Sequence, residues 1–163
     1  MIRFIAAIDQ KRGIAKEGRI PWHLPTDEQY FLQKTSQDGG VVLMGRATFE
    51  AIGHPLKERR NIVISKSLGP TEGIEVMNDL QQALHVAKDV WVIGGAAIFE
   101  QTLSFADELY ITRIETDENC DRFFPEFEKG FELTSKSKPR HENGLTFRFC
   151  KYRRHHDQKM LAS

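Results

Sequence analysis

The sequence predicts a single α/β domain with a mostly parallel central sheet, flanked by about four helices and closed by an antiparallel C-terminal edge hairpin. Its 163 residues suit one domain. Short, nearly continuous apolar runs are typical of strands buried on both faces. Helical patterns lie between these runs, and this alternation favours parallel strands. Near the C-terminus the pattern changes to strict alternation around a turn signal.

Five runs rich in Val and Ile are predicted to form the main strands. They cover residues 2–8, 41–44, 62–64, 90–93 and 109–114. Four helices are expected from apolar residues that recur at helical spacing. They are Pro25–Thr35, Ala47–Ile52, a helix marked by Leu80, Ala83, Leu84 and Ala87 with Asn78 as its N-cap, and one after Gly94-Gly95 that carries Ile98, Phe99 and Leu103.

The C-terminal part is expected to form an antiparallel hairpin. Residues 131–134 and 146–150 alternate between apolar and polar side chains, and Asn143-Gly144 lies between them as a turn signal. We therefore expect a folded domain over residues 1–152, followed by a polar, mobile tail over 153–163. The tail contains His155-His156, but an isolated histidine pair near a terminus seldom holds a metal, so no metal site is predicted.

Composition excludes several classes of partner. The chain carries 23 basic and 23 acidic residues, so no net charge favours nucleic acid or an acidic membrane. No apolar run approaches the roughly 20 residues of a membrane helix, and the apolar N-terminus is too short for a signal peptide. We expect a cytoplasmic chain in which Cys120 and Cys150 are reduced, although a disulfide between them is possible.

Two general nucleotide-binding motifs do not apply. The segment from Gly13 to Ile20 has the glycine spacing of a phosphate loop but lacks its lysine and hydroxyl residue, and it is interpreted as a flexible loop. A GxGxxG fingerprint is absent. Gly94-Gly95-Ala96 follows a strand and precedes a helix, so its backbone N–H groups could hold a phosphate. Alone this is weak evidence for a phosphate site, because a double glycine between a strand and a helix is often only a tight turn.

Asp27 is the most informative single residue. On a helix from Leu24 it shares one side with Glu28, Phe31 and Thr35. One interpretation is a solvated first-turn acid that the helix dipole stabilises. The other is a carboxylate beside an aromatic wall in a cleft, where its pKa would be perturbed and it could bind the amidine-like edge of a ligand.

Four blocks resemble the dihydrofolate reductase family. Residues 20–27, IPWHLPTD, are similar to the family's Pro-Trp-x-Leu-Pro-x-Asp signature. Further similar blocks are MGRATFEAIG at 44–53, LKERRNIVIS at 56–65 and VIGGAAIF at 92–99. They occur in the expected order and at the expected separations, and with the strand at 109–114 the resemblance covers residues 2–152. It favours the cleft interpretation of Asp27.

The resemblance implies NADPH-dependent reduction of 7,8-dihydrofolate to 5,6,7,8-tetrahydrofolate, with hydride transfer to C6 and protonation at N5. The length of 163 residues, without an obvious apolar surface stripe, suggests a monomer. Asp27 would pair with the pterin, helped by Trp22 and by Thr112. Arg59 would pair with the α-carboxylate of the substrate's glutamate tail. The remaining substrate-binding residues would be Ile5, Ala6, Phe31, Ile52, Leu56, Ile93 and Phe99.

The resemblance also implies an NADPH site. Arg46, Ser65 and Lys66 would bind the 2′-phosphate and favour NADPH over NADH. Residues 13–23 would form a lid over the nicotinamide. The other cofactor-binding residues would be Ala7, Ile14, Gly18, Ala47, Thr48, Gly94, Gly95, Ala96, Ala97, Ile98 and Phe99.

Some positions depart from common members of the family. Glu28 stands where an apolar side chain often lines the benzoyl pocket, so it either points to solvent or repels the glutamate tail. Ala97 replaces a frequent basic residue and Phe99 a frequent tyrosine. Ala96 replaces a possible third glycine. Cys120 replaces a usual glycine in a loop where we predict that Asp121 contacts the backbone of the lid.

Two other functions remain open at this point. A reductase of the same fold acts on a ribosyl-aminopyrimidine in riboflavin synthesis, but it should lack the Trp22 and Asp27 block. A non-catalytic NADPH-binding protein would be expected to lose Asp27 or Arg59 while keeping Gly94-Gly95. All of these residues are present.

Overall fold

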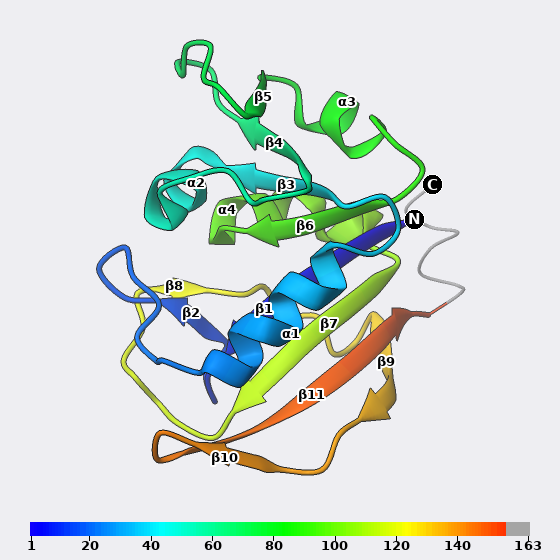
Figure 1. Ribbon diagram of the computed structural model, residues 1–163. Helices are drawn as coiled ribbons and strands as arrows, with labels where there is room; N and C mark the ends of the chain where they lie inside the picture. Colours follow the sequence, from blue (N-terminus) through cyan, green and yellow to red (C-terminus); the bar gives the residue numbers. More distant parts are fainter. Residues whose placement is uncertain (156–163) are drawn as a thin grey trace.

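The computed structural model describes residues 1–155 and has the expected α/β architecture (Figure 1). Its large sheet contains β1 (Ile2–Ile8), β3 (Val41–Gly45), β4 (Arg60–Ile64), β5 (Ile74–Met77), β6 (Val90–Gly94), β7 (Glu108–Ile114), β9 (Phe131–Lys136), β10 (Arg140–Glu142) and β11 (Leu145–Arg154). The strand order is β10-β11-β7-β1-β6-β3-β4-β5, and β9 also pairs with β11. Neighbours from β7 to β5 are parallel, whereas β11 is antiparallel to β7, β9 and β10.

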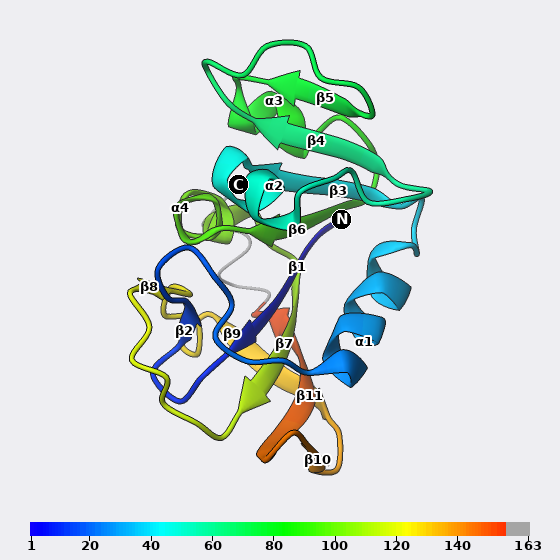
Figure 2. The same ribbon diagram turned by 60° about the vertical axis from the view of Figure 1, so that its left-hand side comes forward.

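Helices cover both faces of this sheet. Figure 2 shows α1 (Pro25–Thr35) and α4 (Ala96–Thr102) on opposite sides. The alternation of β1 explains the two layers, because successive strand residues point to opposite faces. Phe4 belongs to the cluster that also contains residues of α4 and of α3 (Leu80–Leu84). Ile5 belongs to the cluster that contacts α1 and α2 (Arg46–Ile52).

The five predicted strands and four predicted helices are all present, with small changes in their bounds. The predicted N-cap of α3 is wrong: Asp79, not Asn78, caps the helix, and its Oδ1 accepts a hydrogen bond from Gln82 N at 3.0 Å. The helix begins one residue later because β5 continues through Met77. It also ends at Leu84, so Ala87 lies beyond it.

Four short strands were not predicted: β5, β10, β2 (Gly13–Ala15) and β8 (Arg122–Phe123). The last two form a separate antiparallel sheet. The C-terminal edge is also more elaborate than one hairpin. Asn143-Gly144, both with positive φ, joins β10 to β11, and residues 131–136 instead pair with the distal half of β11.

The end of the domain lies slightly beyond the expected position. β11 runs to Arg154, so Arg153 and Arg154 are strand residues rather than tail. The other tail residues, 156–163, lie outside the described part of the chain. Within residues 1–155, Cys120 and Cys150 are free thiols, and no helix has the length and apolar character to cross a membrane.

Asn61 on β4 fixes the loop that follows α2. Its side chain is buried, and its Oδ1 accepts a hydrogen bond from Leu56 N at 2.9 Å. Its Nδ2 donates to Leu56 O and to Arg59 O, each at 2.9 Å. This one amide therefore sets the positions of two residues that sequence analysis places in the site.

We expect Asn61→Leu to lower the free energy of unfolding by about 3 kcal/mol, because it removes three hydrogen bonds and leaves buried backbone groups of Leu56 unpaired. Urea unfolding would measure this. Thr71→Ala is a suitable control, since Thr71 is exposed and its hydroxyl donates to the nearby Gly69 carbonyl. A loss in the Asn61 variant no larger than in this control would contradict the role given to Asn61.

Candidate active site

The candidate site lies where the parallel strands end. β1, β3 and β6 are neighbours, and their carboxyl ends are Ile8, Gly45 and Gly94. Ligands of open parallel sheets bind at this edge. α2 begins directly after β3, and α4 begins directly after Gly94-Gly95, so both helices start at the same edge.

Most of the apolar residues expected around the pterin lie in one cluster. It lies on the sheet face that carries α1 and α2 and contains Ile5, Phe31, Ile52, Leu56 and Ile93. The structure does not bring two other expected residues to this group. Ala6 points to the opposite face, and Phe99 is buried there with its ring centroid 5.2 Å from that of Phe4.

Asp27 lies in the first turn of α1 and faces Thr112 on β7. Its Oδ1 accepts a hydrogen bond from Thr112 Oγ1 at 2.6 Å. The helix receives no side-chain cap from Leu24. Instead Glu142 of β10 reaches across: its Oε1 accepts from Thr26 N at 3.0 Å and its Oε2 from Thr26 Oγ1 at 2.6 Å. The hairpin thus fixes the turn that carries Asp27.

Burial raises the pKa of Asp27 to about 6 from its ordinary 3.8. The hydrogen bond from Thr112 opposes this rise in pKa, and the negative charges of Glu28 and Glu142 add to it. Asp27 is thus not a freely solvated first-turn acid, which favours the cleft interpretation over the solvated one. Near neutral pH it is a weakly acidic group that can exchange a proton.

The side chain of Glu28, unlike that of Asp27, is exposed to solvent. Its side chain is 62% exposed, and its Oε1 lies 3.5 Å from Nδ1 of His23, which is also exposed. Of the two alternatives for Glu28, the structure therefore favours the one in which it points to solvent. Trp22 is half-buried against the cluster of Leu24, Ile114 and Phe147, which Ala7 also contacts.

Arg59 is held at the rim rather than free at the surface. Its Nε donates to Thr35 Oγ1 at 3.0 Å and its Nη1 to Lys57 O at 2.6 Å. Its Nη2 donates to Leu32 O. The guanidinium therefore bridges the end of α1 and the loop after α2, with its position fixed before any ligand arrives.

The residues expected at the cofactor meet at the ends of β3, β4 and β6. The Gly94-Gly95 peptide bond is cis, and Gly94 has a φ of 122°. A Cβ at Gly95 would lie 3.3 Å from Thr48 Oγ1, so the absence of a side chain lets α2 approach closely. Ala96, Ala97 and Ile98 form the first turn of α4, where Ala97 is exposed and Ile98 is buried.

Arg46 and the segment after β4 lie together. Arg46, at the start of α2, donates from Nε to Glu50 Oε1 at 2.7 Å and from Nη1 to Ser67 Oγ at 2.9 Å. Ser65 Oγ in turn accepts a hydrogen bond from Leu68 N at 3.0 Å. Ala47 and Lys66 are exposed beside them. The structure thus brings Arg46 to the segment that carries Ser65 and Lys66.

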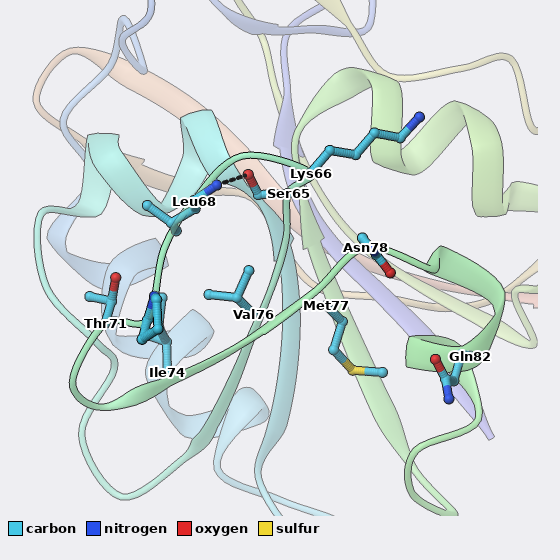
Figure 3. A pocket seen from close by; sticks show the side chains of 10 residues that line it. Ser65, Lys66, Leu68, Thr71, Ile74, Val76, Met77, Asn78 and Gln82 are labelled. Atoms are coloured by element: carbon cyan, nitrogen blue, oxygen red, sulfur yellow. Dashed lines mark hydrogen bonds between the residues drawn. The ribbon is translucent and has the colours of Figure 1, made fainter.

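A hollow of about 630 Å³ adjoins this segment at the outer edge of the sheet (Figure 3). In Figure 3 the Lys66 side chain points away from the other labelled residues. Sequence analysis did not identify this hollow, because β5, which forms much of its wall, was not predicted. It is lined by Ser65, Lys66, Leu68, Pro70, Thr71, Ile74, Val76, Met77, Asn78 and Gln82.

The predicted lid is tied down by the loop between β7 and β8. Asp121 Oδ2 accepts a hydrogen bond from Glu17 N at 2.9 Å, and Asp121 N donates to Ala15 O at 3.0 Å. This confirms the prediction that Asp121 contacts the backbone of the lid. Ile14, on β2, packs against the core, whereas Gly18 is exposed near the tip with a φ of 76°.

Comparisons with known proteins agree with this geometry. A family model described as "Dihydrofolate reductase" matches residues 1–154. The dihydrofolate reductase of Bacillus subtilis is 37% identical over 166 residues, covering 98% of each chain. That of Haemophilus influenzae is 42% identical over 125 residues, covering 75% of this chain and 77% of its own. The type 3 dihydrofolate reductase of Salmonella typhimurium is 41% identical over 131 residues, covering 78% and 80%. The chain belongs to the dihydrofolate reductase family.

Proposed function

We propose that this chain reduces 7,8-dihydrofolate to 5,6,7,8-tetrahydrofolate with NADPH and so supplies one-carbon metabolism. The observation that carries the proposal is the Asp27–Thr112 pair between β7 and α1, the helix whose Phe31 packs against the apolar cluster around Ile5. Relatives named dihydrofolate reductase support it. The pyrimidine reductase and the binding-only protein are less well supported, since Asp27 and Arg59 are both present and held in place.

Asp27 would bind the pterin and orient it. Its carboxylate can accept hydrogen bonds from a ring N–H and from the 2-amino group, two donors that lie side by side on the pterin edge. Thr112 fixes the carboxylate from the side of β7. The apolar cluster around Ile5 and Phe31 would enclose the ring, and Arg59 would pair with the α-carboxylate of the tail.

The proton and the hydride arrive at neighbouring atoms. With a pKa of about 6, Asp27 polarises the bound ring while a water delivers the proton to N5. NADPH, when bound, supplies the hydride that C6 accepts. Trp22 and the lid over residues 13–23 would help to keep bulk water from these atoms.

The residues present fit a phosphorylated dinucleotide. Arg46 and Lys66 offer two cations, and Thr48 and Ser65 offer hydroxyl groups. α2 and α4 both begin after a glycine that provides no side-chain cap, so first-turn N–H groups remain available to an anion. Arg46 and Lys66, with Ser65, would recognise the 2′-phosphate that distinguishes NADPH from NADH.

We also propose that the enzyme acts as a monomer in the cytoplasm on a small-molecule substrate, without nucleic acid. The balanced charge gives no reason for a polyanionic partner. The free thiols of Cys120 and Cys150 are compatible with a reducing compartment. Gel filtration coupled to light scattering would measure the oligomeric state directly.

The reaction is tested by the loss of absorbance at 340 nm with NADPH, with and without dihydrofolate. We expect folate-dependent oxidation in the wild type and a fall in kcat/KM of roughly 10²-fold or more in Asp27→Asn. Glu28→Gln, which changes the neighbouring exposed acid, is the matched control and should stay within about threefold. Equal losses in the two variants would exclude a specific role for Asp27, and no folate-dependent oxidation in the wild type would exclude the proposed reaction.

Cofactor preference tests the phosphate set. For the double variant Arg46→Gln, Lys66→Gln we expect the KM for NADPH to rise about tenfold, because two charge-assisted contacts to phosphate are lost. The KM for NADH should change little. Arg60→Gln removes an exposed cation that pairs with Glu75, outside this set, and serves as control. A parallel rise in both KM values would show that Arg46 and Lys66 do not recognise the 2′-phosphate.

The burial of Asp27 as a carboxylate also lowers the free energy of unfolding when the side chain is ionised. Because its pKa is raised from 3.8 to about 6, folding favours the protonated form of Asp27. The stability that the protonated side chain contributes is therefore fully present below about pH 4 and is lost as the pH rises through 6. Asn resembles the protonated acid at every pH. Urea unfolding should therefore find Asp27→Asn more stable than wild type by about 2 kcal/mol at pH 8, with almost no difference at pH 4. A gain independent of pH would contradict this account.

A further inference from the structure

Asp9, a buried acid outside the proposed chemistry, lies where the lid begins. It follows the last residue of β1 and is 3% exposed. Its Oδ1 accepts hydrogen bonds from Lys11 N at 2.9 Å and Gly13 N at 2.7 Å. Its Oδ2 accepts from Glu118 N at 3.2 Å and from Cys120 Sγ at 3.5 Å. The ammonium group of Lys11 pairs with Asp117 instead, at 2.9 Å.

The four donors come from two segments that are more than a hundred residues apart. Lys11 and Gly13 belong to the turn that leads into the lid, and Glu118 and Cys120 belong to the loop between β7 and β8. The same loop holds the lid a second time through Asp121 and Glu17. The stretch between Gly13 and Glu17 is therefore fixed at both ends, at its base through Asp9.

The packing at the base leaves no room for other side chains. A Cβ added to Gly13 would lie 2.5 Å from Cys120 Cβ and 2.8 Å from Asp9 Oδ2. Burial, with the nearby charge of Asp9, raises the pKa of Cys120 to about 11, so the thiol keeps its proton at neutral pH and remains a donor. Each oxygen of Asp9 thus faces two donors in a close-packed junction.

We propose that Asp9 is a positioning residue that holds the base of the lid against the β7–β8 loop and so sets the conformation in which the lid covers the site. It acts through the lid backbone and touches neither substrate nor cofactor. This inference rests on the proposed function, because the lid matters to catalysis only if the cleft binds dihydrofolate and NADPH.

Asp9→Asn is the sharpest test, because the amide has almost the same shape as the carboxylate. An amide offers one acceptor oxygen and one NH₂ donor. In one orientation the NH₂ group faces two backbone donors, Lys11 N and Gly13 N. In the other it faces Glu118 N, and the sulfur of Cys120 is only a weak acceptor. One side of the junction must therefore open. Asp117→Asn is the matched control: it makes the same change of charge in the same loop, but at an exposed acid.

The first measurement is amide hydrogen exchange of the ligand-free protein, which does not depend on activity. In Asp9→Asn we expect exchange within residues 11–19 to become at least about tenfold faster, while β3 and β4 keep their protection. Asp117→Asn weakens only an exposed ion pair with Lys11, so its lid exchange should rise by less than about threefold. Unchanged lid exchange in Asp9→Asn would overturn the proposal, and so would a uniform increase over the whole sheet, which would indicate a general loss of stability.

The second measurement separates this inference from the proposed function. In single-turnover experiments with NADPH and dihydrofolate we expect Asp9→Asn to slow hydride transfer about tenfold, with the Kd for dihydrofolate changed less than about twofold. Unchanged hydride transfer would refute the positioning role. If the lid exchanges faster in Asp9→Asn but the wild type does not oxidise NADPH with dihydrofolate, the role of Asp9 as an anchor is supported and the proposed reaction is rejected.

Discussion

The burial of β1 on both faces and along both edges is the constraint on which the rest of the molecule depends. β6 pairs with one edge and β7 with the other, while the side chains of Phe4 and Ile5 fill opposite layers. Because its direction and register are fixed in this way, the end of β1 is a rigid point. The turn that leads into the lid starts there at Asp9, and β7, the neighbour on one side, presents Thr112 to Asp27.

Around that rigid point, polar groups from distant segments fix the parts that would otherwise move. Glu142 caps α1 from the C-terminal hairpin, Asn61 shapes the loop that carries Arg59, and Asp9 joins the lid to the β7–β8 loop. All three side chains accept or donate hydrogen bonds with backbone groups. Such contacts set the positions of these segments, and the negative charge of Glu142 also contributes to the raised pKa of Asp27.

The sequence was sufficient for the central sheet because strands buried on both faces, such as 2–8 and 90–93, leave continuous apolar runs. The strands it missed are short and exist through tertiary pairing: β2 has three residues and β8 two. For Asp27, helical spacing left two interpretations, and the residue that decides between them, Thr112, is 85 positions away. Asp9 gave no signal at all, since three of its four donors are backbone N–H groups, which no sequence pattern records.

The pairing of β1 also governs how the chain can be assembled on the ribosome. Ile2 lies opposite Val90, and Ile5 lies opposite Tyr110, so the first strand has no partner until most of the protein has been synthesised. Contacts between such distant segments form late, because the entropy cost of closing a long loop must be met before the contacts can stabilise the chain. The apolar face of β1 therefore stays exposed through much of translation. An unpaired apolar strand of this kind is prone to aggregate, so the emergence of β6 and β7 is the step that removes this risk for β1.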